Sequence, residues 1–181
     1  MDTITTFTGE DFAPRSPDPE KLHLRDIAHA LSLLTRANGH FAQFYSVGQH
    51  SLNCTREAAA RGFSPLVQLG ALLHDASEAY LCDIPRPLKR AMEDYRRDED
   101  RLQRCVEGKY LPGVLSDDDR KAIRAIDDDM MIWEFHALMP KKDVFPQHPP
   151  MASSPDFSLR PFAEVENAFL NVYTSLAAEL R

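Results

Sequence analysis

Apolar residues recur at helical spacing along most of the chain. Ile27, Leu31 and Leu34 are spaced by four and three residues, which places them on one face of a helix. The same spacing recurs in two later segments, through Leu66, Leu69, Leu72 and Leu73 and through Phe162, Val165, Phe169, Val172 and Leu176. Together with two further segments, the pattern predicts helices over about 24–38, 47–61, 65–82, 116–139 and 162–181. A strongly charged segment, 87–109, predicts another helix with a solvated face.

Residues that start or stop helices divide these segments. Asn38-Gly39 and Gly62 are typical of helix ends, and Ser116 before three aspartates is typical of an N-cap. The alternation at 3–7 predicts a short strand or half of a hairpin. We therefore predict an all-α helical bundle with a minor N-terminal β element, in a single domain. Its expected parts are an arm at 1–23, a helical core at 24–139, a proline-rich loop at 140–161 and a last helix at 162–181.

Composition narrows the function classes. The chain has 181 residues, with 21 Lys and Arg against 28 Asp and Glu, a net charge of −7. A chain this acidic lacks the basic surface that duplex nucleic acid requires. Three cysteines without CxxC spacing suit a reducing cytoplasm. No apolar run has the length of a membrane span, and the first residues do not resemble a secretory signal. We expect a cytoplasmic protein that binds neither duplex nucleic acid nor membranes.

Two histidines and two aspartates are candidate metal ligands. His74-Asp75 lies in the C-terminal part of an apolar helix, and His50 opens the preceding one. Asp127 shares a helical stripe with Ile123 and two methionines, whereas Asp128 and Asp129 point elsewhere. Buried polar groups require partners, and a metal is one such partner. As alternatives to metal binding, His50 is hydrogen-bonded to the backbone, and Asp127, Asp128 and Asp129 form an acidic helix face in solvent.

His50, His74, Asp75 and Asp127 combine imidazole and carboxylate ligands from three helices. This mixture suits one divalent transition metal such as manganese, cobalt, iron or zinc, and the lack of thiolates disfavours a structural zinc site. Four protein ligands leave room for water and a substrate oxygen.

These residues form the H…HD…D pattern of the HD-domain metal-dependent phosphohydrolases. Three segments, RANGHFAQFYSVGQHS, ALLHDASEAYLCDIPRPLKR and AIRAIDDDMMIWE, resemble a bacterial and prophage branch near the 5′-deoxynucleotidases. The branch also resembles phage dATP triphosphohydrolases, and the resemblance covers about 6–137. It implies that His50, His74, Asp75 and Asp127 hold one metal.

The resemblance also implies roles for four more residues. Glu78 matches the carboxylate that orients or deprotonates the attacking water, and Asp83 matches a second carboxylate that shuttles a proton or orients that water. Arg36 and Lys89 match residues that bind phosphate. Alternatively, Arg36 caps its helix, Lys89 is a surface residue, and Glu78 pairs with Lys89 or Arg86. In deoxynucleotidases that exclude ribose, a bulky aromatic residue follows the arginine, whereas this chain has Ala37.

Three hypotheses follow. The first is a phosphohydrolase that converts deoxynucleoside 5′-monophosphates to nucleoside and phosphate. The second is a deoxynucleoside triphosphate triphosphohydrolase, and the third is a nucleotide-binding regulator without turnover. The expected partner is a small nucleotide substrate, and the resemblance implies a homo-oligomer. The 140–161 loop is expected to cover the site or to form an oligomer contact.

Overall fold

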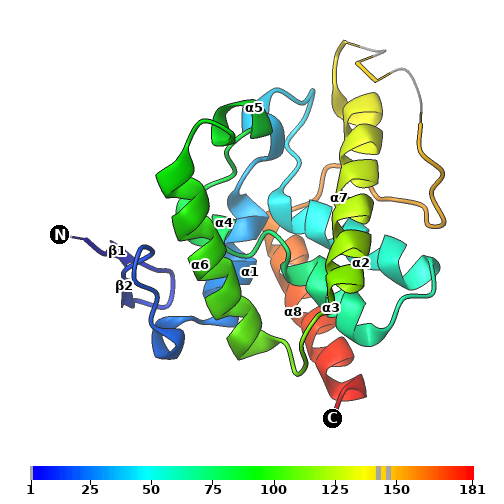
Figure 1. Cartoon of the computed structure of the whole chain (residues 1–181). Helices are drawn as coiled ribbons and strands as arrows, with labels where there is room; N and C mark the ends of the chain where they lie inside the picture. Colours follow the sequence, from blue (N-terminus) through cyan, green and yellow to red (C-terminus); the bar gives the residue numbers. More distant parts are fainter. Residues whose placement is uncertain (1, 142–143, 146–147) are drawn as a thin grey trace.

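The computed structural model describes residues 2–141, 144–145 and 148–181, and it is mainly helical (Figure 1). The helices are α1 (Leu24–Leu33), α2 (Val47–Ala60), α3 (Pro65–Leu73), α4 (Glu78–Leu81), α5 (Arg86–Lys89), α6 (Glu93–Tyr110), α7 (Asp117–Leu138) and α8 (Phe162–Glu179). Two 3₁₀ turns lie at Pro19–Lys21 and Arg36–Gly39. The predicted all-α class is confirmed.

The predicted β element is a small hairpin. β1 (Ile4–Thr5) pairs antiparallel with β2 (Asp11–Phe12), and Gly9 has a φ of 90° in the turn between them. Phe12 is fully buried, and its ring centroid lies 4.5 Å from that of Tyr80. Burial of Phe12 fixes this arm to the helical core.

The main core forms where α1, α2, α3 and α8 pack together. Leu31, Leu72 and Phe169 are fully buried in this core. A β-carbon at Gly48 would lie 3.2 Å from the Leu31 backbone, so glycine permits α2 to cross α1 closely. Within the described residues, no helix combines the length and apolar character that a membrane crossing requires.

The predicted helix over 65–82 is interrupted, which corrects the sequence-based expectation. α3 ends at Leu73, residues 74–77 form a turn, and α4 begins at Glu78. Gln103 of α6 explains how the break is tolerated: its amide donates to the Leu73 carbonyl and accepts from the Ser77 N–H. These bonds satisfy backbone groups that a continuous helix would satisfy itself.

Two other predicted boundaries also shift. The first helix ends at Leu33 rather than at Asn38, and 36–39 form a tight turn in which Ala37 and Asn38 have φ near 50°. The predicted helix over 87–109 divides into α5 and α6. Left-handed φ is costly for residues other than glycine and is often found next to functional sites.

The described part of the 140–161 segment contains no helix or strand, as predicted, and it is bound along α2. Gln49 donates to the carbonyls of Asp156 and Ser158, and Asn53 donates to that of Asp156. Glu57 accepts from the N–H groups of Ala152 and Ser153. These three α2 side chains are buried and spaced four residues apart, so they form a row of partners for the segment. Residues 142–143 and 146–147 lie outside the described residues.

We expect Glu57→Gln to destabilise the fold at neutral pH. Burial raises the pKa of Glu57, but hydrogen bonds from Ala152, Ser153 and Arg61 outweigh burial and lower the pKa from 4.5 to about 2. The lowered pKa corresponds to about 3 kcal/mol as an upper bound, which solvent screening reduces. This stabilisation is present above pH 4.5 and is lost as pH falls through 2. An amide directs its NH₂ group at these donors and loses that stabilisation.

Urea unfolding at pH 7 and at pH 3 measures the effect, which should shrink at the lower pH. Glu164→Gln is the control, because Glu164 is exposed and its ion pair with Arg160 lies on the surface. Equal losses in the two variants at pH 7 would contradict this role for Glu57.

Candidate metal centre and active site

Four potential ligand atoms converge at one point inside the helical core. They are His50 Nε2 from α2, His74 Nε2 and Asp75 Oδ2 from the turn after α3, and Asp127 Oδ1 from α7. His50 Nε2 lies 3.2 Å from His74 Nε2 and 3.2 Å from Asp127 Oδ1, and His74 Nε2 lies 3.3 Å from Asp75 Oδ2. Ligands about 2.0–2.2 Å from one ion lie roughly 3 to 3.5 Å apart. The spacing therefore fits a shared cation.

The hydrogen bonds of the two Nδ1 atoms show that each Nε2 atom can direct a lone pair at this point. His74 Nδ1 is 2.7 Å from the Ala71 carbonyl oxygen, which only accepts, so Nδ1 carries a proton. His50 Nδ1 lies 2.6 Å from the Glu134 carboxylate and donates to it in the same way. In neutral histidines both Nε2 atoms are then acceptors. Two imidazole lone pairs and two carboxylate oxygens face one another, an arrangement that a cation satisfies.

The electrostatics of these groups show that the centre requires positive charge, from protons on the rings or from a bound cation. Burial lowers the pKa of His74, but Asp75 and Asp127 outweigh it and raise the pKa well above its usual range. Burial likewise opposes ionisation of Asp127, but His50 and His74 hold its pKa well below the usual range. The pocket therefore favours positive charge at its centre, and a divalent cation supplies it.

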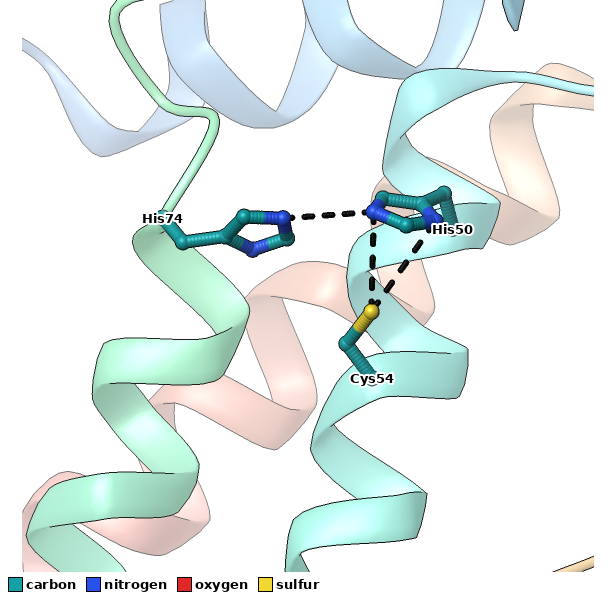
Figure 2. Close-up of side chains that lie close together, drawn as sticks. All are labelled: His50, Cys54 and His74. Atoms are coloured by element: carbon teal, nitrogen blue, oxygen red, sulfur yellow. Dashed lines mark hydrogen bonds between the residues drawn. The ribbon is translucent and has the colours of Figure 1, made fainter. Parts of the chain in front are cut away.

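Cys54 also lies beside this centre (Figure 2). His50, Cys54 and His74 place ligand atoms within 4.8 Å of one another, and this group could hold a metal ion. Cys54 Sγ is 3.5 Å from His50 Nε2 and 3.9 Å from His50 Nδ1, so the sulfur lies against the ring. A sulfur sharing an ion with Nε2 would lie about 5 Å from Nδ1, given usual bond lengths. The two aspartates complete the set more directly.

Arg36 is a buried cation at the edge of this cluster. It lies beyond the end of α1 and contacts carboxylates: Nη1 is 3.4 Å from Asp75 Oδ2, and Nη2 is 3.2 Å from Glu134 Oε2. Arg36 therefore contacts the candidate centre instead of capping its own helix. Its guanidinium also lines the cavity described below.

Glu78 is buried and incompletely paired. Its Oε2 has no hydrogen-bond partner among the described residues, and Oε1 lies 3.5 Å from Lys89 Nζ. Burial, followed by the charges of Asp75 and Asp83, raises its pKa well above the usual range. Glu78 thus pairs with Lys89, which was one of the alternatives. Lys89 Nζ lies closer to Glu99 Oε1, at 2.6 Å.

A cavity of about 280 Å³ opens beside the cluster. Carboxylates and cations that line it include Arg36, Asp75, Glu78, Asp83, Arg86, Lys89 and Asp127. The remaining wall is apolar and consists of Ala37, Phe41, Ile84, Pro85, Pro87, Met131 and Phe135. Phe41 and Phe135 meet edge to face with ring centroids 5.4 Å apart. The cavity is therefore lined by both charged and aromatic side chains.

All eight candidate residues lie at this site. His50, His74, Asp75 and Asp127 form its centre, while Arg36, Glu78, Asp83 and Lys89 line the cavity or contact the centre. The described residues of 140–161 do not line the cavity.

Sequence reasoning missed Cys54, Glu134 and Glu99 as site residues. Glu134 contacts His50 and Arg36, Arg86 contacts Asp127, and Glu99 contacts Lys89. Glu134 follows Asp127 by seven residues and so shares its helical face, a signal available in the sequence. Glu99 carries no such signal.

Comparisons with known proteins give relatives without assigned activities. No family model matches the chain. It is 40% identical over 117 residues to uncharacterized protein YfdR of Escherichia coli, covering 64% of this chain and 63% of the relative. It is 39% identical over 118 residues to an uncharacterized protein of Rhodobacter capsulatus, covering 61% and 60%. The matches thus span less than two thirds of these relatives. A mainly helical chain whose His50, Cys54 and His74 could hold a metal is compatible with an HD domain.

Proposed function

We propose that this chain is an HD-type, divalent-metal-dependent phosphohydrolase that converts deoxynucleoside 5′-monophosphates to nucleoside and phosphate. The observation that carries the proposal is the convergence of four ligand atoms beside a cavity whose wall includes cations and aromatic residues. The cavity is small for a ligand site, since such pockets run upward from about 300 Å³. A monophosphate suits this size better than a triphosphate.

The proposed metal is one divalent ion held by His50, His74, Asp75 and Asp127. When bound, it supplies Lewis acidity for phosphoester hydrolysis at neutral pH. Manganese, cobalt, iron and zinc all accept this ligand set.

Two carboxylates of the chain transfer protons, and two cations neutralise the charge of the phosphoryl group. Glu78 accepts a proton from the attacking water as the water oxygen bonds to phosphorus. Arg36 and Lys89 neutralise the phosphoryl oxygens. The bond from phosphorus to the sugar 5′-oxygen breaks, and Asp83 donates a proton to the leaving oxygen. Burial raises the pKa of Asp83, which favours the protonated acid that this role requires.

Product analysis across a nucleotide panel tests the proposal. Metal-stripped protein is supplied with manganese, cobalt or zinc and incubated with the four dNMPs, the four dNTPs and AMP. Nucleoside and phosphate from the monophosphates support the proposal. Triphosphate release, or turnover confined to dNTPs, would indicate the triphosphohydrolase instead. Tight nucleotide binding without turnover under any metal would indicate a regulator.

We expect Ala37→Trp to raise the preference for dAMP over AMP at least tenfold, which is about 1.4 kcal/mol. Ala37 lines the cavity directly after Arg36, where the resembling deoxynucleotidases that exclude ribose carry a bulky aromatic residue. A larger side chain there removes the room that a 2′-hydroxyl requires. The ratio of kcat/KM values for dAMP and AMP measures the effect, and an unchanged ratio with retained dAMP turnover would contradict it.

A further inference from the structure

Arg86 connects two segments at the edge of the candidate centre. Its guanidinium contacts two consecutive carboxylates of α7: Nη2 lies 2.6 Å from Asp127 Oδ2, and Nη1 contacts Asp128 Oδ1. We call the group Asp127, Arg86 and Asp128 the arginine clasp. Asp128, which sequence reasoning placed away from the site, therefore contacts it through Arg86.

The clasp fixes the orientation of the Asp127 carboxylate. Oδ2 is held by Arg86, whereas Oδ1 lies 3.2 Å from His50 Nε2 and 3.8 Å from His74 Nε2. One oxygen is thus directed at the centre and the other is occupied. A carboxylate held in this way binds an ion through one oxygen, which keeps a coordination position open for other ligands.

The backbone around Arg86 suits a fixed partner. Pro85 and Pro87 flank Arg86, and their rings restrict φ on both sides of it. The Arg86 side chain is 47% exposed and that of Asp128 is 53% exposed, whereas that of Asp127 is 15% exposed. Arg86 and Asp128, which are accessible, therefore hold the less accessible Asp127. An exposed ion pair contributes little to stability, so the main consequence of the clasp is local orientation.

We propose that Arg86, anchored by Asp128, is a positioning residue that holds Asp127 as a one-oxygen metal ligand. The inference rests on the metal site of the proposed function, but it requires neither the proposed substrate nor turnover. Arg86 acts through Asp127 and transfers no proton in this role. A lysine at position 86 would keep one positive charge but could not contact both carboxylates as a planar guanidinium does.

Manganese affinity without substrate tests the clasp directly. Manganese is titrated into the metal-stripped protein, and electron paramagnetic resonance detects the free ion. The titration gives the Kd for the wild type and for R86A, R86K and D128N. Loss of a residue that orients a metal ligand typically weakens binding 10- to 100-fold. We expect a loss in that range for R86A, and smaller losses for R86K and D128N. Methylguanidinium added to R86A should restore part of the affinity.

D118N is the matched control, because Asp118 lies on the same helix, is 92% exposed and pairs only with Lys121 among its described ion pairs. Its Kd should equal that of the wild type. Thermal unfolding confirms that each variant is folded. Unchanged manganese affinity in both R86A and D128N would overturn the proposal, as would a wild type that binds no manganese.

Steady-state kinetics separate this role from direct phosphate binding. If Arg86 is a positioning residue, R86A lowers kcat when substrate is saturating and metal is subsaturating. A raised KM for R86A with unchanged manganese affinity would overturn the proposal and indicate a phosphate contact. If the wild type binds manganese, R86A binds it weakly and neither hydrolyses any nucleotide, the clasp stands and the proposed function fails.

Discussion

Asp75→Ala is expected to abolish metal binding and phosphate release together. Asp75 Oδ2 lies 3.3 Å from His74 Nε2 and 3.7 Å from His50 Nε2, so its removal takes one of four ligand atoms from the centre. We expect manganese or cobalt affinity to fall at least 100-fold, more than for a residue that only orients a ligand. Calorimetric titration of stripped protein and phosphate release from dNMPs measure the two effects.

The position of Asp75 makes this variant informative about mechanism. The side chain also contacts Arg36, so a second variant, Asp75→Asn, keeps the volume and tests whether charge or space is responsible. Asp118→Ala on the exposed face of α7 serves as the control for loss of an aspartate. Phosphate release that persists in metal-free Asp75→Ala would refute the metal-dependent mechanism.

Glu78→Gln is expected to lower kcat by a factor of about 10² to 10⁴, the usual contribution of a general base. Metal affinity should stay within a few-fold of the wild type, because Glu78 lies outside the four ligand atoms. Burial and neighbouring carboxylates raise the pKa of Glu78, so its buried charge opposes folding. Glutamine removes that charge and has nearly the same shape. The unfolding temperature should therefore be unchanged or slightly higher.

Single-turnover kinetics with saturating metal isolates the chemical step in this variant. Glu93→Gln is a suitable control, because Glu93 is exposed in the first turn of α6. Retention of more than a tenth of wild-type kcat in Glu78→Gln would exclude Glu78 as the base. A parallel loss of metal affinity would instead place Glu78 among the ligands.

Helix positions followed closely from the sequence where local signals were strong. Ser116 caps α7 and forms a capping box with Asp119, and α2 and α8 begin at or near the predicted residues. The apolar stripes of these helices identify their buried faces, because periodic burial constrains every turn. The same logic selected Asp127 as a carboxylate on an apolar stripe, whereas His50 was selected because it opens its helix.

The break after Leu73 was not predictable from local signals. Residues 65–82 contain no glycine or proline between Gly70 and the end of the segment, and helical propensity alone favours continuation. The break depends on Gln103, which lies 30 residues from Leu73 and satisfies the interrupted backbone. Such a contact exists only when α6 packs against α3, so a single segment cannot reveal it.

The sequence by itself determined the helical class, most helix starts and two histidines, His50 and His74, that could hold a metal, because these depend on periodicity, capping and side-chain chemistry. Only the tertiary structure decided that the four ligand atoms converge, that Glu134 fixes the His50 ring and that Arg86 holds one oxygen of Asp127. These features depend on distances of a few ångströms between distant segments. Chain folding sets those distances, and no local pattern encodes them.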